Sequence, residues 1–474
     1  MQTQMTTSEE LFQKAYPAYA ATSPLDELRS SEYGGLDRDG HVYLDYTGAG
    51  LYASSQVQDH AALLLNNTFG NPHSTNPTSL AMTRLVEQTR SYVFEFFNAS
   101  PDEYEVIFTL NASGALKIVG ESYPFAPDGQ YLLTFDNHNS VNGIREFARA
   151  KGAKVTYAPV MPPDLRIDDR KLKELLDTAV PETNNLFSFP AQSNFSGVRH
   201  SLEWIERAQQ KGWDVLLDAA AYAPTNRLDL GRWHPDFVTL SFYKMFGYPT
   251  GVGCLLARKQ TLTKLQRPWF AGGTITVASV QADRYYLHGG AEAFEDGTLN
   301  YLSLPAVQIG LRHLTTIGME MIHTRVRCLT GWLLDELTKL HHHNGTPLVQ
   351  VYGPLETRER GGTVTFNFFD PDGHFIDHRL VERRANEVGI SLRTGCFCNP
   401  GGGELALGIS AEELSTCMVK TRERLTFDDF RRCIDAKSTG AVRVSLGLVS
   451  TFRDVQRFIC FARWFRDLGV ERLV

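Results

Sequence analysis

The sequence predicts an α/β fold in which helices cover both faces of a mostly parallel sheet. Apolar runs of strand length recur along the chain, and stretches with helical spacing lie between them. Runs that are apolar throughout are typical of parallel strands buried on both faces, and alternation with helices is typical of βαβ units. The predicted strands are residues 105–109, 131–135, 185–189, 215–218 and 237–241, and predicted helices include residues 170–178 and 202–210.

The length and composition indicate a two-lobed globular chain. Of its 474 residues 42% are hydrophobic, which is ample for a core. We expect a large lobe over residues 56–307 and a smaller α+β lobe formed by residues 1–55 and 308–474, with strands at 363–368 and 441–445 and helices at 319–340 and 427–434. The formal net charge of −7 gives no sign of a nucleic-acid partner, and no apolar run reaches the roughly 18 residues of a membrane span.

The cysteines and the N-terminal residues bear on the compartment. Seven cysteines, an odd number in a long chain, argue against a disulfide framework and for free thiols in a reducing environment. The first residues lack the basic and apolar regions of a signal peptide. We therefore expect a cytoplasmic protein without a membrane segment.

Two predicted strands run into turns of small residues. A short strand at residues 41–45 is followed by a glycine-broken turn at residues 46–50. The strand at 105–109 is followed by a loop that contains Ser113, and a helical pattern begins at Leu116. A strand, such a loop and a helix start form an anion site, because the first-turn N–H groups are free and the helix dipole favours a phosphate. A capped helix without a ligand is the alternative that this motif leaves open.

Asp218 and Lys244 follow two neighbouring predicted strands. Because ligands of open α/β sheets bind at the carboxyl ends of the strands, both side chains are expected to face one crevice. A lysine amine and a carboxylate suit pyridoxal 5'-phosphate, since the amine forms a Schiff base and the carboxylate keeps the pyridine nitrogen protonated. The spacing also fits a surface lysine and a helix-capping aspartate.

Motifs spread over nearly the whole chain carry a resemblance to a known family. They are residues 70–74, 136–140, 194–197, 241–251, 294–298, 393–401 and 440–445. In this order they resemble the class V aminotransferase-type enzymes, which have the fold of type I pyridoxal phosphate-dependent transferases. The resemblance is strongest to the cysteine-desulfurase domain of molybdenum cofactor sulfurases.

The resemblance implies a role for each residue of a cofactor site. Lys244 would form the Schiff base, Asp218 would pair with the pyridine nitrogen, and His138 would stack on the ring. Asn194 would meet the 3-oxygen of the cofactor and also lie near the substrate. The residues implied to hold the phosphate are Ala112, Ser113, Ser241, Tyr243 and, across the interface of a homodimer with shared active sites, Thr274.

A second chemical centre is predicted at residues 393–401. The planar fork of Arg393 suits the α-carboxylate of an amino acid, which is the role the family gives it. Cys398 falls on the position of the persulfide-forming cysteine, and Cys396 is an additional thiol of undetermined role. No second pair of ligands at zinc spacing accompanies them, so no metal site is expected. The glycine-rich run at residues 400–403 predicts a mobile loop. The cysteines expected to pack inertly are Cys254, Cys328, Cys433 and Cys460.

The implied reaction is the desulfuration of L-cysteine, in which Cys398 takes the sulfur as a persulfide and alanine is released. A C–S lyase that eliminates across a cysteine conjugate, and a cofactor-binding scaffold without turnover, are the alternatives. The phosphate loop departs from the family at Leu110 and Asn111, where a small residue and glycine are usual. Eukaryotic molybdenum cofactor sulfurases carry a further C-terminal domain, whereas this chain stops at Val474, so the acceptor could be the molybdenum cofactor or a separate protein.

Overall fold

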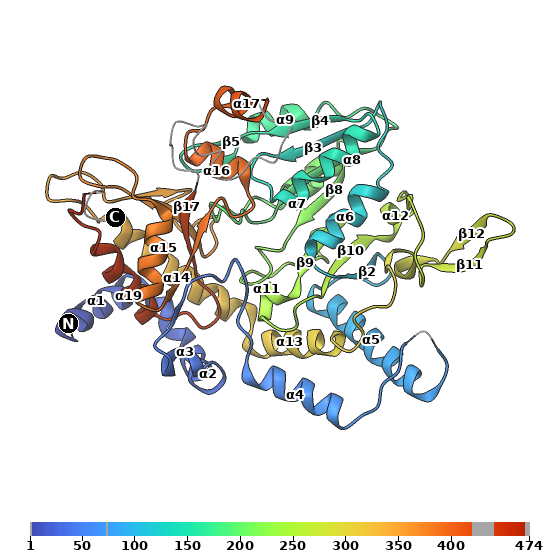
Figure 1. Cartoon of the computed structure of the whole chain (residues 1–474), viewed down its shortest axis with the longest axis horizontal. Helices are drawn as coiled ribbons and strands as arrows, with labels where there is room; N and C mark the ends of the chain where they lie inside the picture. Colours follow the sequence, from blue (N-terminus) through green and yellow to red (C-terminus); the bar gives the residue numbers. More distant parts are fainter. Residues whose placement is uncertain (1, 73, 420–439, 470–474) are drawn as a thin grey trace.

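The computed structural model describes residues 2–72, 74–419 and 440–469 (Figure 1). Its centre is a seven-stranded sheet in the order β2-β10-β9-β8-β7-β3-β4. Strand β10 is antiparallel to both of its neighbours, and the other pairs are parallel. This arrangement confirms the predicted α/β fold with a mostly parallel sheet. The strands are β2 (Tyr104–Thr109), β3 (Gln130–Thr134), β4 (Lys154–Ala158), β7 (Asn185–Pro190), β8 (Asp214–Asp218), β9 (Phe237–Ser241) and β10 (Gly253–Arg258).

Both faces of this sheet are buried, as the apolar runs predicted. Successive residues of a strand point to opposite faces, and Leu216 lies in one apolar cluster while Val215 and Leu217 lie in another. Helices α6 (Ala112–Ser122), α7 (Asn139–Asn142) and α8 (Ile144–Ala150) contribute to the cluster that contains Leu216. Helices on the other cluster include α5 (Pro77–Phe96), α10 (Glu203–Gln209) and α13 (Leu304–Ile317).

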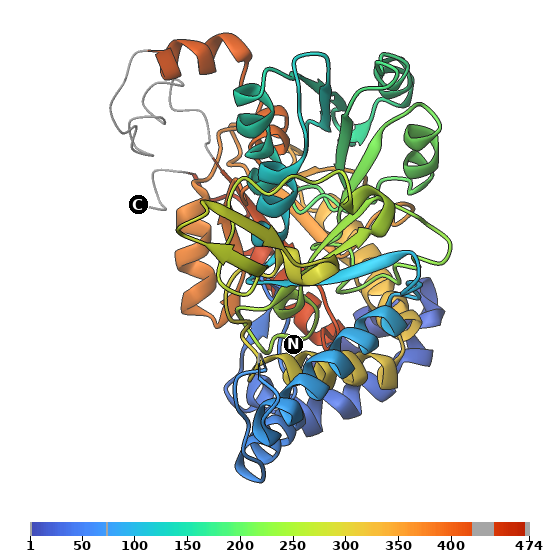
Figure 2. The ribbon, with the colours of Figure 1, turned by 90° about the vertical axis from the view of Figure 1, so that its right-hand side faces the viewer.

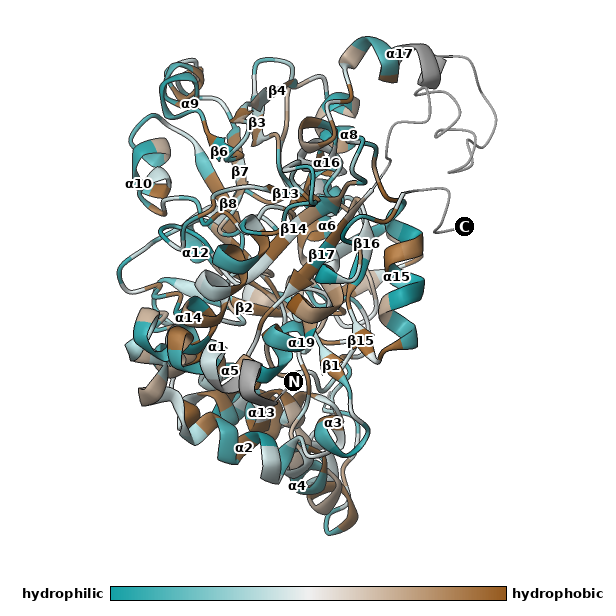
Figure 3. Ribbon diagram, turned by 90° about the vertical axis from the view of Figure 1, so that its left-hand side faces the viewer, coloured by the Kyte–Doolittle hydropathy of each residue, from teal (hydrophilic) through white to brown (hydrophobic). Residues whose placement is uncertain are grey.

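A second, antiparallel sheet has the order β13-β14-β17-β16. In Figure 3 its strands β14 and β17 are mostly brown, whereas the outer helix α15 carries teal residues, in keeping with the burial of both strands. A two-stranded parallel ladder, β1 with β15, lies beside it. The elements here are β1 (Val42–Tyr43), β13 (Val349–Tyr352), β14 (Thr363–Phe368), β15 (Ile390–Ser391), β16 (Arg393–Gly395), β17 (Ala441–Ser445), α14 (Met319–Thr338), α15 (His378–Glu387) and α19 (Phe452–Arg463).

The two ends of the described chain meet at this second sheet. Phe12 of α1 (Gln2–Ala15) stacks on Phe452 of α19 with ring centroids 4.9 Å apart, and Figure 1 shows both helices on the left. The remaining helical elements are η1 (Pro17–Thr22), α2 (Pro24–Glu32), α3 (Gly35–Arg38), α4 (Ser54–Leu65), α9 (Asp169–Leu176), α11 (Phe242–Phe246), α12 (Lys259–Leu262), η2 (Gly290–Phe294), α16 (Pro400–Ala406) and α17 (Ala411–Val419). A small ladder pairs β5 (Val160–Met161) with β6 (Arg166–Ile167).

A hairpin of β11 (Ile275–Ser279) and β12 (Arg284–Leu287) extends from the body. It reaches furthest to the right in Figure 1 and lies in front in Figure 2. Val277, Val280 and Tyr286 expose large apolar surfaces on it.

Most of the elements expected from the sequence agree with the structure to within about two residues, as is usual at element ends. Helix α6 is an exception, because it begins at Ala112, four residues before the apolar pattern that starts at Leu116. The predicted helix at residues 427–434 and Cys433 lie outside the described residues. No helix of the described chain is long and apolar enough to cross a membrane.

Candidate active site

A cavity of about 140 Å³ opens at the carboxyl ends of β8 and β9. Asp218 is the last residue of β8, and Lys244 lies in the short helix α11 that directly follows β9. The two side chains therefore border one cavity, the arrangement expected at the strand ends of an open α/β sheet. Other residues that line it are Asn111, Ala112, Ser113, His138, Gln192, Asn194, Ser241 and Tyr243.

Burial sets the charge state of the lysine. It lowers the pKa of Lys244, and the nearby Asp218 carboxylate opposes this shift. Two guanidinium groups, those of Arg443 and Arg393, lower the same pKa further. A lysine with a lowered pKa has more of its amine neutral near pH 7, as a nucleophile or base requires. Asp218 is buried, and its Oδ1 accepts a hydrogen bond of 3.0 Å from the N–H of Ala220, which fixes the carboxylate.

His138, four residues after the end of β3, is the N-cap of helix α7. Nδ1 of His138 accepts a hydrogen bond of 3.1 Å from the N–H of Ser140. In the neutral ring the proton is therefore on Nε2. Burial lowers the pKa of His138, so the imidazole is neutral at physiological pH and its flat face is suited to stacking on an aromatic ring.

The helix α6 starts at the cavity. Asn111 is its N-cap and accepts from the N–H of Gly114 at 3.0 Å, with an extended backbone that needs no glycine. The family departure at this position thus keeps the helix start intact. The N–H of Ala112 donates to Oγ of Ser241 at 2.9 Å, and the hydroxyls of Ser113 and Ser140 are 2.7 Å apart. The N–H groups of Ala112 and Gly114 are thus bonded to side chains, and the helix dipole together with the hydroxyls of Ser113 and Ser241 suits a phosphate.

Arg393 is held by a carboxylate that the sequence did not single out. Its Nε and Nη2 donate to Oδ2 of Asp45 at 2.9 and 2.6 Å, and this bond raises the pKa of Arg393. Oδ1 of Asp45 accepts from Nη2 of a second arginine, Arg443, at 3.0 Å. Asp45 ends a predicted strand before a glycine-rich turn, as Asp218 ends another strand, so the same signal could have found it. Arg443 lay inside a recognised motif but was given no role.

Arg443 is a buried cation beside the cysteine loop. Its guanidinium lies 4.6 Å from the ring centroid of Phe397, and its Nη1 donates to the carbonyl of Asn194 at 3.1 Å. Burial lowers the pKa of Arg443, and Asp45 opposes that shift. A guanidinium stays charged in proteins. The site therefore holds a permanent positive charge next to Cys398.

The loop that carries Cys398 is fastened to the cavity. Nδ2 of Asn194 donates to the carbonyl of Phe397 at 2.7 Å, and its Oδ1 accepts from Nδ2 of Asn399 at 2.9 Å. The N–H of Asn139 donates to the carbonyl of Cys398 at 2.7 Å. Phe397 and Cys398 both have φ of 55°, a conformation that non-glycine residues adopt only when their surroundings impose it. Asn399 and Asn139 carry no sequence signal that predicts these contacts.

The prediction of a mobile loop after Cys398 is wrong. Residues 400–403 form the first turn of helix α16, and Gly401, Gly402 and Gly403 are buried. A Cβ at Gly401 would overlap the carbonyl oxygen of Phe135. These glycines therefore allow close packing, and Asn399 caps the helix by accepting from the N–H of Gly402 at 3.0 Å.

The free thiols divide by exposure. Cys396 and Cys398 are exposed, and Cys254 and Cys328 are buried as expected for inert packing. Cys460 is exposed, so its predicted burial is wrong. Cys460 is exposed because the end of helix α19 is amphipathic. Phe458 and Ile459 lie on its buried face, and Cys460 does not.

Thr274 uses its hydroxyl within its own loop. It is fully buried, accepts from the N–H of Ala271 at 3.0 Å and donates to the carbonyl of Ala271 at 2.9 Å. A role in a second subunit's phosphate site would require this hydroxyl to exchange partners, so that role stays a prediction.

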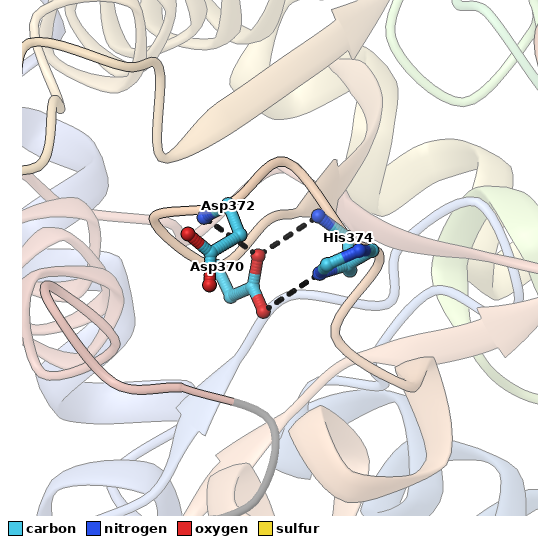
Figure 4. Close-up of side chains that lie close together, drawn as sticks. All are labelled: Asp370, Asp372 and His374. Atoms are coloured by element: carbon cyan, nitrogen blue, oxygen red, sulfur yellow. Dashed lines mark hydrogen bonds and ion pairs between the residues drawn. The ribbon is translucent and has the colours of Figure 1, made fainter.

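A separate acidic cluster, Asp370, Asp372 and His374, is explained by its own turn (Figure 4). The Oδ1 of Asp370 accepts from the N–H groups of Asp372 and His374 at 3.0 and 2.8 Å. Its Oδ2 lies 3.3 Å from Nδ1 of His374. The carboxylate therefore organises a loop, and the cluster gives no reason to expect a metal.

The donors around the cavity fit pyridoxal 5'-phosphate. An amine, an opposing carboxylate, a neutral imidazole and a helix start with hydroxyls correspond to the aldehyde, ring nitrogen, ring face and phosphate of that cofactor. Fold and site together define an α/β enzyme of the pyridoxal phosphate-dependent class. Residues 42–458 match the family described as Aminotransferase class-V. The chain belongs to the class V aminotransferase family, and its cofactor is pyridoxal 5'-phosphate.

The curated relatives are more specific. The chain is 37% identical over 489 residues to the molybdenum cofactor sulfurase of Solanum lycopersicum, covering 96% of this chain and 59% of that protein. It is 37% identical over 463 residues to the molybdenum cofactor sulfurase of Homo sapiens, covering 92% of this chain and 51% of that protein. The chain thus spans between half and three-fifths of the length of these relatives.

Solved structures agree on the fold. A cysteine desulfurase from Thermococcus onnurineus has a TM-score of 0.74 at 22% identity, covering 92% of this chain and 97% of that one. The cysteine desulfurase CsdA of Escherichia coli has a TM-score of 0.73 at 20% identity, covering 93% and 98%. The expected fold and family are therefore confirmed.

Proposed function

We propose that the protein is a cysteine desulfurase, which moves the sulfur of L-cysteine to Cys398 and releases alanine. The observation that carries the proposal is the attachment of the Cys398 loop to the cavity. The carbonyls of Phe397 and Cys398 are bonded to Asn194, which lines the cavity, and to Asn139, which follows His138. An exposed thiol on a loop that is bonded to a residue lining the pyridoxal phosphate site is suited to attack a substrate's sulfur.

The residues on the sheet side would hold the cofactor and move a proton. The bound cofactor supplies an electron sink for the carbanion formed at the substrate's Cα. Burial favours the neutral form of the Lys244 amine, and this amine would take the Cα proton. Asp218 would keep the ring nitrogen protonated, and His138 would lie against the ring. Ala112, Ser113, Ser241 and Tyr243 would contact the phosphate.

The residues on the loop side would bind substrate and accept sulfur. Arg393 would bind the α-carboxylate, and Asn194 would lie beside the amino acid. The Cys398 thiolate would attack the substrate's Sγ, so that an S–S bond forms and the Cβ–S bond breaks. The electron pair of that bond passes to the carbon skeleton, which takes up protons and leaves as alanine. The guanidinium of Arg443 lies over the ring of Phe397, the residue before Cys398.

The partners and organisation belong to the same proposal. The exposed apolar side chains Trp269, Val277, Val280 and Tyr286 on and beside the β11–β12 hairpin support a homodimer. The sulfur would pass to the molybdenum cofactor or to an acceptor protein, by analogy with the curated relatives. We also propose a large lobe over residues 56–307 and a smaller lobe formed by residues 1–55 and 308–474, and the presence of two main sheets supports this division. The free thiols Cys396 and Cys398 support a cytoplasmic location, which is part of the same proposal.

Product analysis tests the proposal. The purified protein, loaded with pyridoxal 5'-phosphate, is incubated with L-cysteine, and alanine and pyruvate are quantified. Desulfuration predicts alanine, and Cys398→Ser should abolish it in reducing-agent-free single turnover while Cys396→Ser retains it. Pyruvate in place of alanine, unaffected by Cys398→Ser, would instead identify a C–S lyase, for which cysteine thioethers are the next substrates to test.

A further inference from the structure

The carboxylate of Asp45 joins two arginines of the site. Its Oδ2 receives Nε and Nη2 of Arg393 at 2.9 and 2.6 Å, and its Oδ1 receives Nη2 of Arg443 at 3.0 Å. The Asp45 side chain is only 11% exposed, whereas that of Arg393 is 52% exposed. The carboxylate is thus inside the protein, and one of its two arginines reaches the open side.

This contact leaves one edge of Arg393 available. A guanidinium has five N–H donors, and a carboxylate can bind either the Nε–Nη2 edge or the Nη1–Nη2 edge in a bidentate manner. Asp45 occupies the first edge. For Nη1 the structure shows no hydrogen-bond partner within residues 2–72, 74–419 and 440–469. The second edge can therefore receive another carboxylate while the first remains bound to Asp45.

The charges of the group favour a single additional carboxylate. Two guanidinium groups and one carboxylate give a net charge of +1, and Arg443 is buried. The α-carboxylate of an amino acid would compensate this positive charge. Without Asp45, Arg443 would be a buried cation lacking its carboxylate, and Arg393 would lose the bonds that orient it.

The glycine-broken turn after β1 is built around this ion pair. A Cβ at Gly48 would overlap both carboxylate oxygens of Asp45 and come within 2.8 Å of Nη2 of Arg393. The N–H groups of Gly48 and Ala49 donate to the carbonyl of Asp45 at 2.9 and 3.1 Å. The N–H of Gly50 donates to the carbonyl of Tyr243 at 3.0 Å, one residue before Lys244. The turn therefore connects the Asp45–Arg393 pair to helix α11, which carries Lys244.

We propose that Asp45 is a positioning residue, which holds Arg393 with its Nη1–Nη2 edge directed at the substrate's α-carboxylate and thereby selects for substrates that carry one. This inference rests on the proposed function of Arg393. It assigns a purpose to the turn at residues 46–50, namely to fix the distance between the carboxylate-binding edge and the Lys244 amine.

The test is Asp45→Asn, which keeps the shape of the side chain and removes its charge. The loaded enzyme should keep its cofactor absorption, show a KM for L-cysteine raised about tenfold, and keep kcat within about threefold, because carboxylate orientation is weakened and the reacting groups are untouched. Asp45→Glu should recover part of the loss. Asp37→Asn, which removes a carboxylate from another arginine pair, that with Arg29, is the matched control and should leave KM unchanged.

Calorimetry with 3-mercaptopropionate, which has a carboxylate but no amine and cannot be turned over, separates this inference from the proposed function. Asp45→Asn should weaken its binding about tenfold and leave the binding of cysteamine, which has no carboxylate, unchanged. Equal weakening of both ligands, or of neither, would overturn the inference even if L-cysteine is desulfurated. If L-cysteine is not desulfurated, the calorimetric contrast still decides it.

Gly48→Ala provides a second variant in case Asp45→Asn does not fold. It displaces the ion pair without removing a charged group, so it should weaken 3-mercaptopropionate binding in the same direction by a smaller factor. A folded Gly48→Ala protein with unchanged binding of 3-mercaptopropionate would contradict the role of the pair.

Discussion

The two sides of the active site are built in different ways. On the sheet side, Asp218 ends one parallel strand and Lys244 follows the end of the adjacent strand, and a local backbone N–H fixes the carboxylate of Asp218. On the loop side, Cys398 is held through side chains distant in sequence, such as Asn194 and Arg443. The topology of the sheet alone therefore positions the groups for the cofactor chemistry. The sulfur-accepting thiol depends instead on a network of contacts between side chains from several segments of the chain.

The largest effect should come from the sheet side. Lys244→Ala removes the amine that binds the cofactor and takes the Cα proton, and we expect alanine production to fall about 10³-fold. The thermal unfolding of the cofactor-free protein should change little. Lys211→Ala, which removes an exposed lysine paired with Asp177, is the control. Alanine production by Lys244→Ala within tenfold of the wild type would show that the sheet side does not supply the cofactor chemistry through this amine.

The loop side should lose stability and sulfur transfer together. Asn399→Ala removes a helix cap and leaves the carbonyl of Asp136 and the amide of Asn194 without their partner, which costs about 2 kcal/mol of unfolding free energy. Denaturant unfolding of the cofactor-free protein measures this cost. Cofactor absorption should be retained while persulfide formation falls. A loss of cofactor binding as large as the loss of persulfide formation would contradict the separation of the two sides.

A glycine substitution tests whether the Cys398 loop is fixed. Gly401→Ala places a methyl group against the carbonyl of Phe135 and should cost about 1–3 kcal/mol of unfolding free energy. Gly272→Ala, where a Cβ meets no atom within 4 Å, should be neutral to about 0.5 kcal/mol. Equal stability of the two variants in denaturant unfolding would restore the mobile loop that the sequence predicts.

The smallest effect concerns pH on the sheet side. Burial lowers the pKa of His138, so below its ordinary value of about 6.5 the unfolded chain binds a proton more readily than the folded one. Stability of the cofactor-free protein should therefore fall as the pH drops from about 6.5 toward the lowered pKa. His138→Phe removes the titration, so its melting temperature should decline less over that range. An identical decline would show that His138 titrates normally.

The sequence predicts the sheet side well because its signals are local. An apolar run followed by a carboxylate or a lysine marks a strand end, and the topology of an open sheet brings such ends together. The sequence predicts helix α6 from another local pattern, a strand followed by a loop of small residues and a helix start. Asn111, where the family usually has glycine, is the N-cap of this helix.

The loop side was predicted less well because its contacts join residues far apart in sequence. Arg443 and Asn194 are separated by 249 residues, and the bond between them has no local pattern. The run at residues 400–403 was misjudged because glycine serves both flexible loops and close packing, and only the neighbouring Phe135 decides between them. Asp45 could have been found by the strand-end rule, but its pairing with Arg393 and Arg443 could not.

The most direct test of the account is to locate the transferred sulfur. The loaded enzyme is treated with one equivalent of L-cysteine, the thiols are blocked, and peptides are mapped by mass spectrometry. Desulfuration through Cys398 predicts one additional sulfur atom on Cys398, none on Cys396, and a matching yield of alanine. Alanine formed with Cys398 unmodified, or with the sulfur on Cys396, would contradict it.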